Sequence, residues 1–379
     1  MNKSVTKGYI INTAVIAALM VGFEIIKSAI GGAVSFKLIL VPSLWQCCYL
    51  IILAASLNLV LGFLGQLSLG HCGFMAIGAY AAALISLACE RVGVFADKSS
   101  FSFILVLLGC ILAAGILAAL VGLLVGIPAL RLRGDYLAII TLGFGMIIVN
   151  IINNLPFAGQ EGLSMGSASA SLYKNGLGFG TASKVTFVWV AIIVTLLCLT
   201  MMFMFIRSKY GRAIKAIRDD EIAAAASGIN TSYYKIFTFT YSAFFSGVAG
   251  ALYACANATL STSSFAFTNG GILNSTFIVV MVVLGGMGSL TGSITSAIIM
   301  FIVNYEIKNG VWVKSLTGIL GGIFAYPMLV YAIILIVVIM FRPKGIFGTY
   351  EFSLVNLSKD IKNYRAKKLK HKPDKKEAK

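Results

Sequence analysis

Charged residues are scarce in this sequence: Asp, Glu, Lys and Arg together make up 11% of the 379 residues, whereas hydrophobic residues make up 59%. A soluble globular protein carries about 25% charged residues, because such residues cover its surface. The scarcity therefore excludes an ordinary soluble enzyme, a disordered tail protein and a nucleic-acid-binding protein. It indicates a membrane protein with several spans.

Metal ligands and catalytic motifs are also few. The sequence has only two histidines, and its seven cysteines form no CxxC pair and stand mostly within apolar runs, as small buried hydrophobes do. It has no GxxxxGK[ST] phosphate loop and no HExxH motif. We therefore expect no enzyme activity, no metal and no cofactor on this chain. The cysteines are Cys47, Cys48, Cys72, Cys89, Cys110, Cys198 and Cys255.

Long continuous apolar runs fill most of the chain. A helical crossing needs about 20 apolar residues, and the runs predict an all-α polytopic membrane protein with about ten transmembrane helices. Their length and continuity exclude a transmembrane barrel, whose strands alternate over about 10 residues. The expected spans are 9–29, 38–62, 66–89, 102–127, 135–154, 185–206, 235–257, 272–287, 290–306 and 321–341.

The N-terminal run resembles a secretory signal, because Lys3 and Lys7 precede the apolar residues Tyr9–Val21. No convincing cleavage site follows, and the apolar run continues beyond the usual length of a signal. We therefore expect a retained first span.

The basic residues predict the orientation. With ten spans and the N-terminus inside, 22 of the 30 lysines and arginines fall on the inner side, as the positive-inside rule requires. Both termini are then cytoplasmic. Residues 1–348 form the predicted transmembrane domain and residues 349–379 a basic cytoplasmic tail, suited to contact with anionic lipid or simply solvated.

Buried charge is nearly absent from the expected spans. Glu24 and Lys27 lie at the outer end of the first span, and His71 is the one weak candidate for a proton relay. A proton-coupled carrier usually needs a buried carboxylate or histidine, so ion-coupled transport is disfavoured. The favoured interpretation of His71 is a structural histidine. Coupling to sodium, through sites built from carbonyl oxygens, stays an alternative.

The loop 207–235 carries the clearest local pattern. Arg212–Ser227 is expected to be one short, Ala-rich helix, with Ser208 as N-cap and Gly228 as the left-handed residue that ends it. Small residues and exposed charge suit docking onto another protein better than lying on lipid, which favours bulkier anchors. One face of the helix is expected to hold Ile214, Ile217, Ala224 and Ala225, and other faces Lys215, Arg218, Asp219 and Ile222.

Two glycine-rich stretches predict broken helices, at Gly62–Gly70 and at Gly285–Gly292. A break exposes backbone polar groups, so Gln66, Ser68 and His71 are candidate residues of a translocation path. Tight packing through small residues is the alternative. The sequences GQLSLG and GMGSLTG in the two stretches form a faint internal echo.

A third stretch, Gly126–Asn154, combines an inner turn with polar residues at the outer end of the following span. Arg131 and Arg133 mark the inner side, and a cluster of asparagines stands near the outer end. Asn150 is the candidate path residue of this cluster.

Several blocks of this sequence resemble the permeases of bacterial ABC importers that include the branched-chain amino acid systems, and specifically the longer of their two permease subunits. The resemblance covers most of the chain from Leu57 to Gly348. Its blocks are LNLVLGFLGQLSLGHCGFMAIGAY (Leu57–Tyr80), PALRLRGDYLAIITLGFG (Pro128–Gly145), the segment Ser208–Ala254, VVLGGMGSLTG (Val282–Gly292) and FRPKGIFG (Phe341–Gly348).

The resemblance implies a second homologous permease, two cytoplasmic ATPases that bind ATP and Mg²⁺, and an extracytoplasmic binding protein. It also implies that Arg212–Gly228 is the loop that couples the ATPases to the spans. Three places depart from the family pattern: Ile222 stands where the general importer pattern has Glu, Met146 stands where relatives commonly have an acidic residue, and Phe157–Leu163 is less glycine-rich. The residues implied for ATPase coupling are Arg212, Ile214, Ile217, Asp220, Glu221, Ala224 and Gly228.

Four hypotheses follow for the function. The first is an importer permease in the bacterial cytoplasmic membrane for leucine, isoleucine and valine. The second keeps this architecture and changes the cargo to urea, short amides or nucleosides. The third is a standalone carrier or channel, which the docking loop and the lack of buried charge disfavour. The fourth is a membrane scaffold without transport, which the glycine-rich breaks disfavour.

Overall fold

The computed structural model describes most of the apolar part of the chain. The described residues fall almost entirely in one compact unit, Leu38–Thr349. The expected first span, 9–29, and the basic tail, 349–379, lie outside them. The described ranges are 34–91, 100–132, 134–155, 163–164, 183–257, 259–265, 275–309 and 327–341, together with residues 345 and 348.

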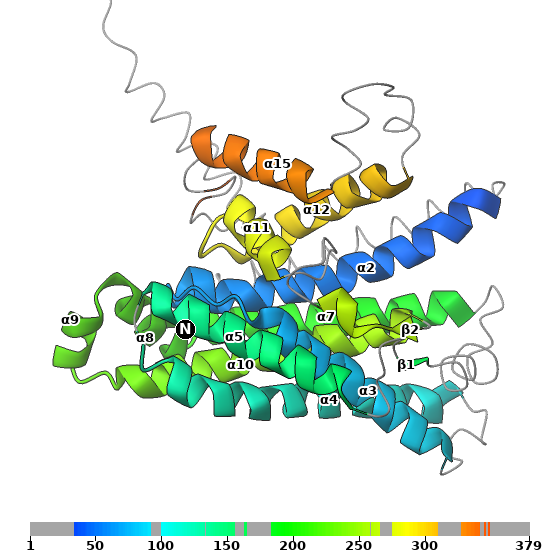
Figure 1. Ribbon diagram of the computed structural model, residues 1–379, viewed down its shortest axis with the longest axis horizontal. Coiled ribbons are helices and arrows are strands. Elements are labelled where there is room, and N and C mark those ends of the chain that lie inside the picture. Colours follow the sequence, from blue (N-terminus) through cyan, green and yellow to red (C-terminus); the bar gives the residue numbers. More distant parts are fainter. Residues whose placement is uncertain are drawn as a thin grey trace, which may run out of the picture. The chain divides into compact units, whose positions relative to one another are not determined.

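Helices make up nearly all of the described structure (Figure 1), and the only strands in these ranges are two-residue segments that pair antiparallel, Leu163 with Leu260. The elements are α2 (Val34–Asn58), η1 (Leu59–Phe63), α3 (His71–Arg91), α4 (Ser100–Ala129), α5 (Asp135–Asn153), β1 (Leu163–Ser164), α7 (Ser183–Arg207), α8 (Lys209–Asp219), α9 (Glu221–Ala226), α10 (Thr231–Ala256), β2 (Thr259–Leu260), η3 (Thr262–Phe265), α11 (Ser275–Gly285), α12 (Leu290–Asn309) and α15 (Pro327–Phe341).

The helices confirm the all-α polytopic prediction. Within the described ranges, six helices are long and apolar enough to cross a membrane, and three shorter ones are equally apolar. These nine correspond to the nine expected spans that fall in the described part of the chain. The six long spans are Trp45–Phe63, His71–Cys89, Leu105–Ala129, Tyr136–Asn153, Trp189–Arg207 and Thr231–Cys255, and the shorter helices contain Ser275–Gly285, Leu290–Asn304 and Leu329–Val338.

One face of α4 shows why these helices suit lipid. Large apolar side chains recur along it at intervals of four or seven residues and are each more than half exposed: Leu105, Leu112, Ile116, Leu120 and Leu124. An apolar stripe of this length is unfavourable in water. It is the expected outer surface of a helix whose solvent is hydrocarbon.

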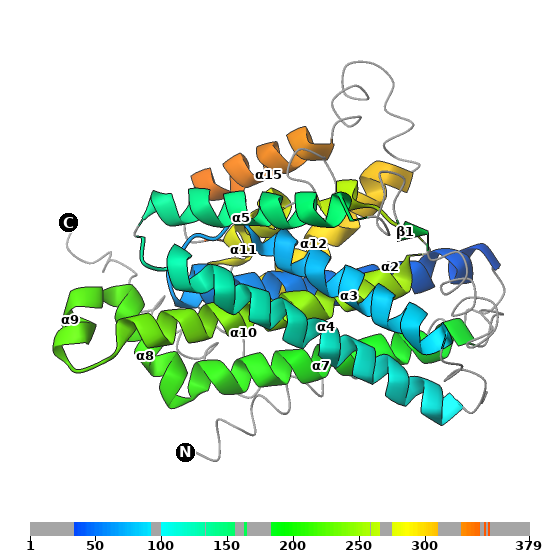
Figure 2. The same ribbon diagram turned by 60° about the horizontal axis from the view of Figure 1, so that its bottom comes forward.

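Helix α10 packs along both α3 and α4 (Figure 2). Small residues permit the close approach of α3 to α10: a Cβ atom at Gly78 would lie 2.2 Å from the carbonyl oxygen of Gly247. In a membrane, helices associate through such close packing, because lipid supplies no hydrophobic drive between them.

Buried hydroxyl groups connect α10 to its neighbours. Ser242 Oγ donates to the carbonyl oxygen of Ser56 at 2.6 Å, and Ser246 Oγ donates to the carbonyl oxygen of His71 at 3.0 Å. The ring of His71 in turn bonds Ser56 Oγ at 2.7 Å. These bonds hold α2, α3 and α10 in register.

A second group of helices, α11, α12 and α15, packs together (Figure 1). Ser296 Oγ on α12 donates to the carbonyl oxygen of Met281 on α11 at 2.6 Å. Tyr331 on α15 contacts the ring of Phe277, with centroids 4.6 Å apart, and bonds Asn304 of α12. This group carries the second of the two predicted breaks, between α11 and α12.

The burial of the cysteines confirms the prediction that they are small buried hydrophobic residues. Five are buried and the other two, Cys89 and Cys255, are partly buried.

Candidate coupling surface and translocation site

Two short helices, α8 and α9, project from one end of the long helices α7 and α10 (Figures 1 and 2). Ser208 is the N-cap of α8, as predicted: its Oγ accepts from the backbone N–H of Tyr210 at 3.1 Å. Ile214 and Ile217 are 1% and 4% exposed, so their side chains anchor α8 to the bundle. The polar face of α8 is left toward the solvent, with Arg212 exposed.

The single helix predicted for Arg212–Ser227 is wrong. The helix breaks at Asp220, whose backbone is extended with φ −156° and ψ 112°. Its carboxylate accepts from the N–H groups of Ile222 and Ala223, at 2.8 and 3.0 Å, and so caps α9. Aspartate is unfavourable inside a helix but favourable as an N-cap, because its carboxylate accepts from the free backbone N–H groups of the first turn.

The end of α9 confirms the predicted stop. Gly228 has φ 81°, the N–H of Ile229 donates to the carbonyl oxygen of Ala224 and that of Gly228 to Ala225. These two bonds define a Schellman motif. Asn230 then caps α10 by accepting from the N–H of Tyr233 at 3.1 Å. The chain therefore turns from α9 into α10 through a fully hydrogen-bonded corner.

An ion pair fixes α9 on α10. Lys235 Nζ lies 2.6 Å from Glu221 Oε1, and the lysine side chain is 5% exposed. A buried ammonium needs such a partner, because leaving it unpaired is costly. Glu221 therefore faces its own chain in this conformation.

The predicted coupling residues divide into two sets. Arg212, Asp220 and Gly228 are exposed, whereas Ile214, Ile217 and Ala224 are buried against the chain. Sequence analysis placed Ile222 on another face and did not include it among the coupling residues; the structure shows that it is the most exposed apolar side chain of α8 and α9, at 76%. The signal for it was present, since Ile222 occupies the place where the importer pattern has Glu.

Both predicted helix breaks are confirmed. The first begins in the π-helix η1 and continues without regular structure through residues 64–70. The second separates α11 from α12 at residues 286–289. Sequence analysis did not predict that the two breaks contact each other: the amide of Asn58 donates to the carbonyl oxygen of Ser289 at 2.9 Å and accepts from the N–H of Gly288 at 3.0 Å.

The predicted path residues do not form one group. Ser68 is 1% exposed, and within the described structure neither Ser68 Oγ nor Gln66 Oε1 has a hydrogen-bond partner, which is unusual for buried polar atoms. His71 is 2% exposed and bonded to Ser56, which matches a structural role. Asn150 is exposed on α5, whereas its neighbour Asn153 bonds Thr262 Oγ1 at 2.7 Å.

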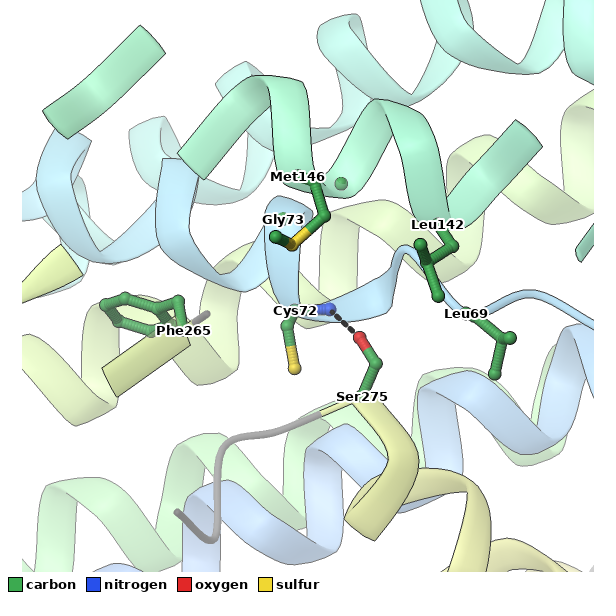
Figure 3. A pocket seen from close by; sticks show the side chains of 8 residues that line it. Leu69, Cys72, Gly73, Leu142, Met146, Phe265 and Ser275 are labelled. Carbon is green, nitrogen blue, oxygen red and sulfur yellow. Dashed lines mark hydrogen bonds between the residues drawn. The ribbon is translucent and has the colours of Figure 1, made fainter. Parts of the chain in front are cut away.

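A small cavity lies beside the first break, where α3, α5 and α11 meet (Figure 3). The N–H of Cys72 donates to Ser275 Oγ at 3.3 Å across it. Met146 lines the cavity from α5. The full lining is Leu69, Cys72, Gly73, Leu142, Gly145, Met146, Phe265 and Ser275.

Comparison with known proteins identifies the family. Residues 39–340 match the family described as the permease component of the branched-chain amino acid transport system. The chain is 34% identical over 316 residues to the high-affinity branched-chain amino acid transport system permease protein LivM of Escherichia coli strain K12, covering 78% of this chain and 67% of the relative.

More distant relatives agree. The probable branched-chain amino acid transport permease protein LivM of Methanocaldococcus jannaschii is 23% identical, with 82% of this chain and 94% of that protein covered. LivH of Salmonella typhimurium, also named as a branched-chain amino acid permease, is 25% identical, with 80% and 92% covered. No solved structure matches the chain. The match over most of the chain, on a multi-pass helical membrane protein, shows that this chain belongs to the family of branched-chain amino acid transport permeases.

Proposed function

We propose that this chain is one of two membrane-spanning subunits of an ATP-driven importer, and that it carries branched-chain amino acids handed over by an extracytoplasmic binding protein. The observation that supports this most is the helix pair α8–α9. It projects from the spans, and its caps, Schellman stop and ion pair with α10 fix it in place. Such a surface suits the transfer of force from a partner to the bundle.

The energy source is assigned to two cytoplasmic ATPases, which bind ATP and Mg²⁺. The exposed part of α8–α9 is the proposed docking surface, with Arg212, Asp220 and Ile222 accessible. Ile222, which is 76% exposed, is the proposed apolar contact of this surface. The buried residues Ile214, Ile217 and Ala224 support this surface from below, and Gly228 sets its angle to α10.

The cargo assignment rests on the named relatives. The cavity beside the first break is lined in part by Leu69, Leu142 and Met146 and is too small for an amino acid, so it carries no weight in the choice of cargo. Gln66 Oε1 and Ser68 Oγ, both buried and without a partner among the described residues, stand in the adjoining loop. They are the proposed polar groups of the path.

The proposed site of action is a bacterial cytoplasmic membrane, with both termini in the cytoplasm. The α4–α5 turn, which carries the exposed Arg131, lies at the same end of the bundle as α8–α9 in both views (Figures 1 and 2). Arg207, Lys209 and Arg212 lie at that end of α7 and on α8. Basic residues gathered at one end mark the cytoplasmic side.

The cargo is tested in proteoliposomes that contain the complete importer, with ATP inside and binding protein outside. Uptake of labelled leucine is measured alone and with an excess of isoleucine, valine, urea, an amide or a nucleoside. We expect isoleucine and valine to compete and the others to leave uptake unchanged. If the importer takes up urea or a nucleoside and no leucine, the cargo assignment is wrong and the importer architecture stands.

A further inference from the structure

We propose that Arg218 is the positioning residue that joins the cytoplasmic helix pair to the two helix breaks, so that a displacement of α8 moves both breaks together. The inference rests on the proposed importer function. It names the contact through which a movement of the ATPases would be transmitted to the transmembrane helices. Arg218 was expected on a face of the coupling helix away from Ile214 and Ile217. The structure shows what that face contacts.

The guanidinium of Arg218 makes a long-range contact with the first break. Its Nη1 donates to the carbonyl oxygen of Gly62, 156 residues away, at 3.0 Å. Its Nε and Nη2 both point to Asp219 Oδ1, at 3.4 and 3.2 Å. Asp219 thus holds one edge of the planar fork and leaves the other edge for Gly62, an arrangement that an arginine can make and a lysine cannot.

The carbonyl of Gly62 is a suitable acceptor because it stands at the end of a helix. The π-helix η1 closes at Phe63, and the carbonyl groups of a last turn have no partner inside their own helix. These groups also carry the negative end of the helix dipole, which a cation stabilises. Arg218 therefore caps the helix that leads into the first break.

Glycines leave the space that Arg218 occupies. A Cβ atom on Gly65, which has φ 75°, would lie 2.6 Å from Arg218 Cγ, and one on Gly288 would lie 3.1 Å from Nη1. Gly65 belongs to the first break and Gly288 to the second. One arginine side chain from α8 therefore contacts both breaks.

The two breaks are themselves bonded, so they are expected to move as one. Asn58 bonds the backbone of Gly288 and Ser289, and a Cβ atom on Gly62 would lie 2.3 Å from the nitrogen of Gly288. A further contact supports the link to α8, since Lys215 Nζ lies 5.4 Å from the ring centroid of Phe63. Arg218 and Lys215, one turn apart, both contact the end of η1.

The first experiment replaces Arg218 in the reconstituted importer and measures leucine transported per ATP hydrolysed. Arg218→Ala should keep ATPase binding and stimulated hydrolysis, whereas transport per ATP should fall about tenfold. Arg218→Lys keeps the positive charge and can donate to the carbonyl oxygen of Gly62, and should recover part of the loss. Arg131→Ala removes an exposed basic side chain in the α4–α5 turn, outside α8–α9; it is the matched control and should behave as wild type.

A reversible tether separates transmission from folding. Cysteines at Phe63 and Lys215, in a cysteine-free background, are joined by a bifunctional methanethiosulfonate reagent and released by reductant. The tether should leave transport per ATP unchanged when Arg218 is present and should restore it at least threefold, reversibly, in Arg218→Ala. A tether that abolishes transport with Arg218 present would show that α8 moves against η1, and would overturn the inference.

The outcomes distinguish this inference from the proposed function. A wild-type assembly that imports no cargo would overturn the importer proposal. A working wild-type assembly, with the same transport per ATP in Arg218→Ala, would overturn only the role of Arg218. Loss of ATPase binding in Arg218→Ala would also overturn it, because the residue would then act in docking.

Discussion

Gly228 ends α9 in a backbone conformation, φ 81°, that side chains with a branched Cβ avoid. Open space surrounds its Cα, since a Cβ atom there would meet nothing within 4 Å. Gly228→Val should therefore strain the corner by about 1–2 kcal/mol without a clash. We expect normal membrane insertion and loss of the ATP hydrolysis that loaded binding protein stimulates in the reconstituted complex.

The matched control for this change is Gly109→Val. Gly109 lies within α4, also has open space around it, and is not among the glycines with positive φ. It should keep stimulated hydrolysis. Wild-type stimulation by Gly228→Val would contradict the assignment of this corner to coupling.

The ion pair of Glu221 with Lys235 makes a second prediction. Glu221→Gln leaves a buried ammonium unpaired and should lower the free energy of opening α9 by about 1–3 kcal/mol, a value below that for a fully buried pair because the Glu221 side chain is 32% exposed. Glu221→Gln with Lys235→Met should cost less than Glu221→Gln alone. Amide hydrogen exchange of α9 measures both. Equal losses in the two variants would show that the pair is not coupled.

The contact between the two helix breaks depends on Asn58. Its side chain satisfies two buried backbone groups of the second break, the N–H of Gly288 and the carbonyl of Ser289. Each group left unsatisfied costs about 1–3 kcal/mol. Asn58→Leu, of similar size, should therefore lower the free energy of unfolding by about 2–4 kcal/mol in a denaturant titration of the purified protein.

Asn154→Leu is the control for Asn58→Leu. The side-chain amide of Asn154 is exposed and donates to the carbonyl oxygen of Asn150 in the preceding helix, at 2.8 Å. Its removal should change stability by less than about 0.5 kcal/mol. If Asn58→Leu is as mild, the breaks do not depend on each other for stability.

Local features of the helices could be read from the sequence, because they depend on neighbouring residues. The cap at Ser208, the stop at Gly228 and the two glycine-rich breaks were all predictable in this way. The break at Asp220 was not. An Ala-rich run favours a continuous helix, and the interruption places Glu221 beside Lys235, a contact between helices.

Contacts between distant parts of the chain could not be predicted from the sequence. The pairing of the breaks joins residues about 230 positions apart, and the bond of Arg218 to Gly62 spans 156. The sequence offered only the echo between GQLSLG and GMGSLTG. For the same reason the sequence placed Ile214 and Ile217 on one face of α8 without showing that this face packs against the bundle, where both side chains are buried.

The orientation of the chain is tested by single cysteines at Ser227 and Asn154, in a cysteine-free background. Both positions are exposed, the first in the α9–α10 turn and the second at the opposite end of α5 from its start at Asp135. The cells are treated so that a membrane-impermeant thiol reagent passes any outer wall while the cytoplasmic membrane stays intact. The reagent should label position 154 and not 227. Labelling of position 227 would reverse the orientation.

The energy source of transport gives the most direct test of the account. The sequence has no phosphate loop. Among the residues whose burial the structure describes, His71 and Lys235 are the only buried histidine, lysine, arginine, aspartate or glutamate side chains. Leucine flux is measured in liposomes that hold this chain alone, and in liposomes with the second permease, both ATPases, ATP and loaded binding protein. We predict flux only in the complete assembly, and gradient-driven uptake by the chain alone would contradict the importer and favour a standalone carrier.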